Sequence, residues 1–546
     1  MRNIKRSIYA VILISAIVLQ GIGTYEIRQI SAFSQAPKHE IQQFQKAKDI
    51  TSCVDITISD KTSSAKLKDN KENTFLKLSG NEQITLKSTE AFSSFYIKWN
   101  KIPGKWKLKV EGKIITCGTN GFLHEYGEFD SKVKEMVIII PEDGAQICDI
   151  FLFTEGELPK WVQIWEPPYA NADMLVLPTH SDDEQLFFAG VMPYYAGECG
   201  LKVQVIYMTN HWRRNDRPHE LLNGLWTVGI RAYPIVSEFP DDARSYGSRG
   251  QTGEEVLKNA LTVYDEYEVT KFQVEMIRRF RPLVIVGHDI NGEYGHGAHR
   301  VNSYTLTRAL EMSYDPDQYP ESAEEYGTWD VPKTYLHLWN KNKIVMNWDI
   351  PLAHFNGKTA FEMAKLGYAC HISQQGTRYT KWISQYKASE IKTYNPCLYG
   401  LYRSMVGEDE IKDDFFEKIS IKHEEHVFSV IPIEIKEASK ETEESEIETS
   451  RQEMTHKSTA SQEATIQGTI TIDLTDSQMP SVSNCLVNDS WEESSQRVSN
   501  CFGNGSWEEP SKKLRGETVV LILMVTGVSV IVVGIGVWFV LKKKRG

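Results

Sequence analysis

The stretch Met174-Leu-Val-Leu-Pro-Thr-His180-Ser-Asp-Asp-Glu184 decides the fold of the central part of this chain. It opens with a continuous apolar run, and similar runs follow at Val203 to Met208 and at Leu283 to Gly287, the last one after a helical stretch at 274–280. Continuous apolar strands that are joined by helices indicate a mostly parallel sheet covered on both faces. From about residue 170 to 410, the sequence therefore predicts an α/β domain.

The first of these strands ends in a group of side chains that can carry chemistry. His180, Asp182 and Asp183 all follow the apolar run within a few residues. Ligand sites in α/β folds lie at the carboxyl ends of the strands. His180 and Asp183 are three residues apart across a turn, so both can face one metal ion, while Asp182 can point toward a water at that ion.

A second group follows the strand Leu283 to Gly287. His296 and His299 are three residues apart, which at the start of a helix places both on one face. One histidine, one aspartate and a second histidine form a three-ligand site with one position open for water, as catalytic zinc requires. We expect one Zn²⁺ per chain, although Fe(II) or Co(II) would fit the same donors.

Together the two groups resemble the PIG-L/LmbE family of zinc-dependent de-N-acetylases, which includes the deacetylase of N-acetylglucosaminyl-phosphatidylinositol. The family motif AHPDDE stands here as Thr179 to Glu184, and its motif GHxxH stands as Gly295 to His299. The resemblance covers roughly residues 171–400. This chain departs from the family at Thr179 and Ser181, where alanine and proline are usual, and neither position supplies a ligand.

The resemblance implies a Rossmann-like (LmbE-like) fold and a role for each motif residue. His180, Asp183 and His299 would bind zinc. Asp182 would be the general base, and His296 would act as an acid or as an oxyanion partner. Arg217 and Glu220, which match an R-x-x-E segment of the family, would contact the substrate. Outside the motifs, His371 either lines the pocket or is an ordinary histidine at a helix end. Asp289 either accepts a hydrogen bond from a metal-bound histidine or is a turn residue.

Before this domain, residues 49–156 contain short apolar or alternating runs that are separated by turn signals, which is typical of an all-β sandwich. Asp69 to Thr74 and Ile147 to Phe153 resemble segments of a discoidin-type, galactose-binding-like module. That resemblance implies an accessory domain that binds carbohydrate or a surface. A spacer sandwich without a ligand is the alternative.

Both ends of the chain carry membrane-addressing patterns. Residues 1–23 resemble a signal peptide, with an uncleaved signal anchor as the alternative. Residues 411–517 read as a disordered Ser/Thr/Glu-rich stalk. The uncharged residues 518–541 are long enough for one transmembrane helix, and 542–546 form a basic cytoplasmic tail. We therefore expect a single-pass type I protein of the cell membrane whose catalytic domain is extracellular.

Composition narrows the classes of partner. The 546 residues include 61 Lys+Arg and 73 Asp+Glu, a net charge of −12, which disfavours nucleic-acid binding. None of the eight cysteines forms a CxxC pair, so a structural cysteine zinc site is not expected, whereas disulfides are permitted in an exported chain.

The predicted function is a metal-dependent hydrolase that removes the N-acetyl group from an amino sugar in a glycan or glycoconjugate outside the cell. Its expected partners are the N-acetylated substrate and, through the C-terminal helix, a lipid membrane. Two alternatives stay open. One is a surface adhesin with a non-catalytic α/β domain, and the other is a zinc amidase that acts on a non-sugar amide.

Overall fold

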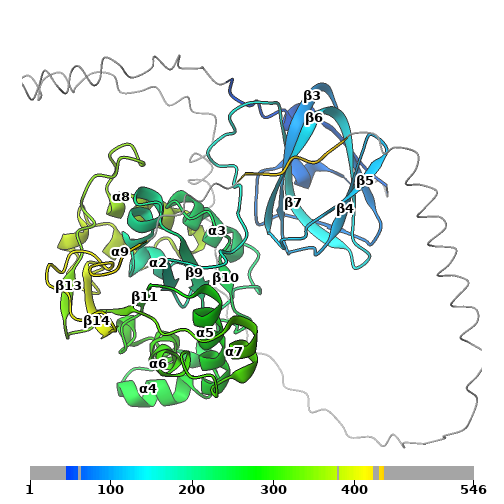
Figure 1. Cartoon of the computed structure of the whole chain (residues 1–546). Helices are drawn as coiled ribbons and strands as arrows, with labels where there is room; N and C mark the ends of the chain where they lie inside the picture. The colour runs from blue at the N-terminus through cyan, green and yellow to red at the C-terminus, as the bar shows by residue number, and fades with distance from the viewer. Residues whose placement is uncertain (1–44, 60–62, 378–379, 422–428, 436–546) are drawn as a thin grey trace, which may run out of the picture. The chain divides into compact units, whose positions relative to one another are not determined.

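The computed structural model describes residues 45–59, 63–377, 380–421 and 429–435 (Figure 1). The predicted signal peptide, the transmembrane helix, the basic tail and most of the predicted stalk lie outside these residues. Within the described ranges, no helix combines the length and the apolar character that crossing a membrane requires. The six cysteines in these ranges are all free thiols.

The N-terminal part is an antiparallel sheet. Its strands are β1 Asp55–Ile58, β2 Leu76–Leu78, β3 Gln83–Trp99, β4 Trp106–Val110, β5 Lys113–Cys117, β6 His124–Ile139 and β7 Ala145–Phe153. They pair in the order β2-β7-β3-β6-β4-β5, with β1 beside β3. All seven strands fall within residues 49–156, where the sequence predicts an all-β domain.

The long strand β3 bends this sheet, so that the sheet encloses a core. β3 shifts register on both sides of Phe92, so that its first half pairs with β1 and its second half with β7. Register shifts of this kind are β-bulges, which bend a strand and increase its twist. The enclosed core includes Phe95, Trp99 and Trp106, whose rings contact one another edge-on or tilted.

The second sheet is mixed. Its strands are β8 Met174–Leu177, β9 Val203–Tyr207, β10 Ile235–Val236, β11 Val284–Gly287, β12 Lys333–His337, β13 Lys343–Val345 and β14 Leu398–Ser404. They pair in the order β10-β9-β8-β11-β12-β14-β13. The first five are parallel, and β14 and β13 are antiparallel at one edge.

The order of the parallel strands confirms the predicted α/β sheet. Counted along the chain, the five strands lie in the order 3-2-1-4-5, which is the Rossmann arrangement. The order reverses between β8 and β11. In open α/β sheets, ligands bind at the carboxyl ends of the strands at this switch point, and both predicted motifs follow these two strands.

Helices cover both faces of the sheet (Figure 1). They are α2 Asp183–Leu186, α3 Arg217–Thr227, α4 Gly253–Ala260, α5 Glu266–Phe280, α6 Gly297–Met312, α7 Pro320–Tyr326, α8 Ala360–Ala369 and α9 Thr380–Ile383. Alternate residues of β8 face opposite sides. Leu175 and Leu177 pack in a core with α5 and α6, whereas Met174 and Val176 belong to the core that contains α3 and α8.

The α/β part continues past the predicted boundary at residue 410. Phe415 and Phe416 are buried, and the ring of Phe415 lies 4.5 Å from that of Tyr335 and stacks on Tyr195. Lys333, fully buried on β12, is paired with Asp409. The first residues of the predicted stalk therefore complete the core, because an adjacent aromatic pair in an otherwise polar stretch has apolar surface to bury.

Candidate metal and catalytic site

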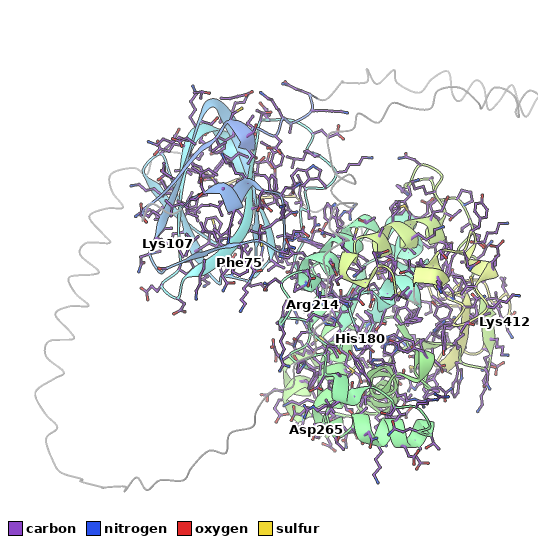
Figure 2. The ribbon with its side chains drawn as sticks, turned by 180° about the vertical axis from the view of Figure 1, so that it is seen from behind. Phe75, Lys107, His180, Arg214, Asp265 and Lys412 are labelled. Atoms are coloured by element: carbon purple, nitrogen blue, oxygen red, sulfur yellow. The ribbon has the colours of Figure 1, made fainter. Side chains whose placement is uncertain are left out.

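The turn after β8 holds its polar side chains in a strained backbone. Asp182 has φ 120°, a region that residues with a side chain rarely adopt. Its N–H donates to Glu184 Oε2 at 2.9 Å, and the N–H of His180 donates to Asp183 Oδ2 at 2.7 Å. Such strain persists only where the surroundings maintain it, and it gathers at functional sites. Figure 2 labels His180 inside the α/β part.

Three of the predicted ligand atoms lie together. His180 Nδ1 is 3.2 Å from Asp183 Oδ2 and 3.1 Å from His299 Nε2, and the last two atoms are 3.1 Å apart. All three residues are buried. Atoms that bind one zinc ion at about 2.1 Å are separated by roughly 3 to 3.5 Å. The described geometry therefore fits the zinc ligand set that the motifs predict.

The protonation of these groups also fits a cation. His299 donates its Nδ1–H to Glu293 Oε2 at 2.9 Å, which leaves a lone pair on Nε2. That lone pair and those of Asp183 and His180 converge, an arrangement that is repulsive unless a proton or a cation lies between them. Burial lowers the pKa of His180, but the carboxylates of Asp183 and Asp241 outweigh it and raise this pKa to about 10.

Glu293 is a fully buried carboxylate that serves three imidazoles. It accepts from Nδ1 of His288 at 2.8 Å and of His337 at 2.7 Å, in addition to His299. Burial alone would raise the pKa of Glu293, yet the histidines hold it well below its usual range. Sequence reasoning missed this residue, which performs the orienting role considered for Asp289.

Asp289 is a turn residue. Its Oδ1 accepts from the backbone N–H and the side-chain amide of Asn291, at 3.0 and 3.3 Å. The preceding His288 lies 3.5 Å from Asp183, but its Nε2 already accepts from the N–H of Thr179 and its Nδ1 donates to Glu293. Both nitrogens of His288 are therefore used, and it is a poor candidate for a metal ligand.

Asp182 lies beside the three ligands and is itself buried. Burial raises its pKa to about 7, with the neighbouring charge of Asp183 adding to the effect and Arg217 opposing it. The Arg217 guanidinium is 3.7 Å from Asp182 Oδ1 and also donates to the carbonyl of Ser181. A carboxylate with a pKa near 7 can accept and return a proton at neutral pH.

His296 faces the same centre from the start of α6. Its ring centroid lies 4.8 Å from that of His180 and 4.7 Å from that of His299. Burial and these two imidazoles hold its pKa well below the usual range. Within the described residues, its Nδ1 is buried without a hydrogen-bond partner, so this atom is available to a ligand. Gly297 lets the helix begin here, because a Cβ would lie 2.0 Å from the carbonyl of Ser245.

Glu220 and His371, which the sequence predicts as candidate substrate contacts, are hydrogen-bonded to other residues of the protein. Both carboxylate oxygens of Glu220 accept from Ser373, at 2.6 and 2.7 Å. His371 is buried, with Nε2 3.1 Å from Glu184 Oε1 and Nδ1 3.5 Å from Ser181 Oγ. In the structure these residues support the site rather than line it, because each is fully enclosed by neighbouring chain.

Two further side chains near the site escaped sequence reasoning. Asp241 Oδ1 lies 3.5 Å from His180 Nε2, and its other oxygen is 3.6 Å from His211 Nδ1. His211 Nε2 accepts from the N–H of Ser181 at 3.2 Å. Both residues follow parallel strands at their carboxyl ends, β9 and β10. A search of every predicted strand end for histidine and carboxylate would have found His211.

The chain is similar to sugar deacetylases. It is 30% identical over 180 residues to 1D-myo-inositol 2-acetamido-2-deoxy-alpha-D-glucopyranoside deacetylase 2 of Saccharopolyspora erythraea, which covers 30% of this chain and 63% of that protein. It is 28% identical over 187 residues to the corresponding deacetylase of Mycobacterium leprae, 30% of this chain and 59% of the relative. These relatives are deacetylases of the kind that the two motifs indicate. The chain spans less than two thirds of their length.

The chain is also similar to an amidase and to a deacetylase of known structure. Mycothiol S-conjugate amidase of Streptomyces coelicolor is 28% identical over 179 residues, 30% of this chain and 60% of the amidase. N,N'-diacetylchitobiose deacetylase of Pyrococcus horikoshii aligns over 43% of this chain and 85% of its own, with 13% identity and a TM-score of 0.31, too low to support an argument. No protein-family model matches the chain.

Proposed function

We propose that the α/β domain is a metal-dependent hydrolase that removes the acetyl group from an N-acetylated amino sugar. The observation that carries this proposal is the convergence of His180, Asp183 and His299 beside a buried Asp182. The similarity to deacetylases of 2-acetamido sugars supports the choice of substrate.

His180, Asp183 and His299 would hold the metal ion, which we propose to be zinc, one per chain. A bound zinc ion supplies a Lewis acid for the carbonyl and lowers the pKa of water toward neutrality. Imidazole and carboxylate donors with an open position are the usual ligands of such catalytic zinc. The donor set of this chain fits that ion.

Asp182 is the general base of this proposal. It accepts a proton from the attacking water while the new C–O bond forms at the acetamide carbon. His296, which presents a buried and unpartnered nitrogen, donates to the carbonyl oxygen as negative charge develops there. When the C–N bond breaks, the proton held by Asp182 passes to the leaving nitrogen. The products are acetate and a free amino sugar.

Arg217 positions the base and balances its charge. Its guanidinium contacts the carbonyl of Ser181 and lies 3.7 Å from Asp182. Tyr246, which is 44% exposed, places its ring 4.5 Å from that of His296. An exposed aromatic ring beside the reacting groups suits a sugar, because ligand sites combine an apolar surface with a few placed polar groups.

The test combines metal content and product release on one sample of the purified full-length chain. Mass spectrometry would measure bound metal, and acetate would be measured after incubation with a panel of N-acetyl sugars. We expect about one zinc per chain and acetate release that a chelator abolishes. A chain that binds no metal and releases no acetate would disprove the proposal and favour the adhesin alternative.

A second candidate is an amidase that acts on a non-sugar amide, and the similarity to a protein named as an amidase, mycothiol S-conjugate amidase, supports amide hydrolysis as the reaction class. The metal, the base and the oxyanion donor would be the same, because both reactions hydrolyse an amide. Simple acetamides in the substrate panel would separate the two. Hydrolysis of these compounds without hydrolysis of any N-acetyl sugar would favour the amidase.

We also propose that the chain is a type I membrane protein with this domain outside the cell. Support comes from the sequence, through the signal-like residues 1–23 and the uncharged stretch 518–541 that a basic tail follows. Protease treatment of intact cells would remove the catalytic domain in this topology. Protection from the protease until the cells are lysed would contradict it.

A further inference from the structure

Helix α3 contacts both the turn of residues 180–184, which we call the catalytic turn, and the N-terminal antiparallel sheet formed by β1–β7, which we call the β-sandwich. Its first turn carries Arg217, which contacts Ser181 and Asp182, and Glu220, which is bonded to Ser373. Farther along α3, Gly224 packs closely against His371, and a Cβ at Gly224 would come within 2.8 Å of His371 Nε2. A displacement of α3 would therefore move groups that hold the catalytic turn.

Another set of α3 side chains is bonded to the sandwich and to the segment that follows it. His219 Nδ1 lies 2.7 Å from His124 Nε2, at the start of β6. Asn223 donates to both carboxylate oxygens of Glu72 and accepts from Gln163 at 2.6 Å. His219 and Asn223 are four residues apart, so they share one face of α3. We call Glu72, His124 and His219 the docking cluster.

The hydrogens in this network can be assigned from its donors. Trp165 Nε1, which can only donate, bonds to Gln163 Oε1, so the 2.8 Å contact of His124 Nδ1 with the same oxygen requires an N–H on Nδ1. A neutral His124 then accepts at Nε2 from the Nδ1–H of His219. Burial lowers the pKa of His219 to about 4 and that of His124 well below its usual range, so both are neutral at pH 7.

The docking cluster is satisfied without a metal ion, even though its ligand atoms lie within 4.8 Å of one another. Glu72 already accepts from Lys98 Nζ at 2.7 Å and from Asn223. The lone pair of His124 is used by His219. A largely buried hydrogen-bond network of this kind rigidifies the elements it joins.

From these contacts we propose that the β-sandwich positions the catalytic base: through His124 it holds helix α3, and α3 holds Arg217 against Ser181 and Asp182. The proposal rests on the function proposed above. In it, His124 is a positioning residue, because it bonds to Tyr96, Gln163 and His219 and acts on Asp182 only through α3. In this proposal the sandwich is more than a spacer, because it contributes to catalysis by holding α3 in place.

The test is His124→Ala in the full-length chain. We expect kcat for acetate release to fall about 10- to 100-fold, with KM and zinc content near wild type, because small displacements of a positioned group cost rate rather than binding. His124→Gln, whose amide can donate and accept as the imidazole does, should recover most of the lost kcat. In a background of Arg217→Ala, the His124→Ala change should have little further effect, since both act through one contact.

Phe92→Leu is the matched control, because Phe92 is fully buried inside the sandwich against Phe129. It should lower stability and leave kcat unchanged. Equal loss of kcat in both variants, no loss in His124→Ala, or additive effects of His124→Ala and Arg217→Ala would each overturn the proposal.

A second readout does not depend on catalysis. Hydrogen exchange of the backbone amides in residues 180–186 should be faster in His124→Ala than in wild type and in Phe92→Leu, because the turn loses its support. Unchanged exchange would refute the positioning role. If wild type proves to have no deacetylase activity while exchange still responds, the proposed function fails and the mechanical link between the sandwich and the turn stands.

Discussion

The protein contains two clusters of histidine and carboxylate side chains whose residue types are alike and whose chemistry differs, one buried and the other buried except for the partly exposed Glu72. In the catalytic cluster, formed by His180, Asp183 and His299, three lone pairs converge at separations of 3.1 to 3.2 Å. In the docking cluster, by contrast, Glu72 accepts from Lys98 and Asn223, and His124 accepts from His219. The types of residue alone therefore do not indicate a metal site. A metal site also needs lone pairs that converge and that no hydrogen-bond donor already uses.

The largest expected effect separates the two clusters directly. Asp183→Ala should abolish both zinc binding and acetate release, because a buried site loses its charged ligand. Glu72→Gln, the matched change in the docking cluster, should keep zinc at about one per chain. Mass spectrometry of both purified variants would check this. Loss of zinc in Glu72→Gln with retention in Asp183→Ala would reverse the assignment of the two clusters.

Asp182→Ala tests the base that stands beside the catalytic cluster. It should retain zinc and lower kcat by about 10²- to 10⁴-fold, the usual contribution of general acid–base catalysis. Steady-state kinetics and metal content measured on the same preparation would establish the result. Wild-type kcat in this variant would remove Asp182 from the mechanism.

Glu293→Gln tests the orientation of the ligand His299. The amide keeps one accepting oxygen, replaces the other with an NH₂ group that cannot accept from an imidazole, and carries no negative charge. We expect zinc affinity to fall about 10- to 100-fold, the range seen when such a partner of a ligand is lost. Competition with a chromogenic chelator would measure it. Asp289→Asn, which changes only a turn, should leave the affinity near wild type.

The smallest effect concerns stability and pH in the docking cluster. Burial lowers the pKa of His219 to about 4, so folded His219 stays neutral while the unfolded chain, with a pKa of about 6.5, binds a proton. Stability is therefore lost as pH falls from about 6.5 toward 4, by about 2 kcal/mol at pH 5. Urea unfolding of wild type and His219→Gln at pH 7.5 and pH 5 would show a smaller loss in the variant. Equal losses would mean that His219 is not the responsible group.

Much of the α/β fold could be predicted from the chain itself. Four-residue apolar runs such as Met174–Leu177 predict strands that are buried on both faces, and runs of this kind joined by helical stretches are typical of a parallel sheet between two helical layers. The pairing of the turn after β8 with the motif after β11 could be anticipated as well, since both follow strands at their carboxyl ends. His180, Asp183 and His299 are indeed brought together in the structure.

Other features depend on contacts between distant residues. Glu293 is hydrogen-bonded to His337, 44 residues away, and no spacing pattern in the sequence predicts that pair. Phe415 looked like part of a polar stalk, although it fills a gap beside Tyr335. Glu220 matched a family segment, but its neighbour Ser373 occupies both of its oxygens.

The type of sheet, the two strand ends that carry the motifs and the identity of the candidate ligands could be read from the chain, because they follow from apolar periodicity and from short local motifs. Which buried histidines keep an open lone pair, and which accept from a hydrogen-bond donor, depends on the folded structure. That difference depends on where residues far apart in the chain, such as His124 and His219, come to lie. Packing creates these neighbours, and hydrogen-bond matching then separates the site that can take a cation from the one that joins two parts of the fold.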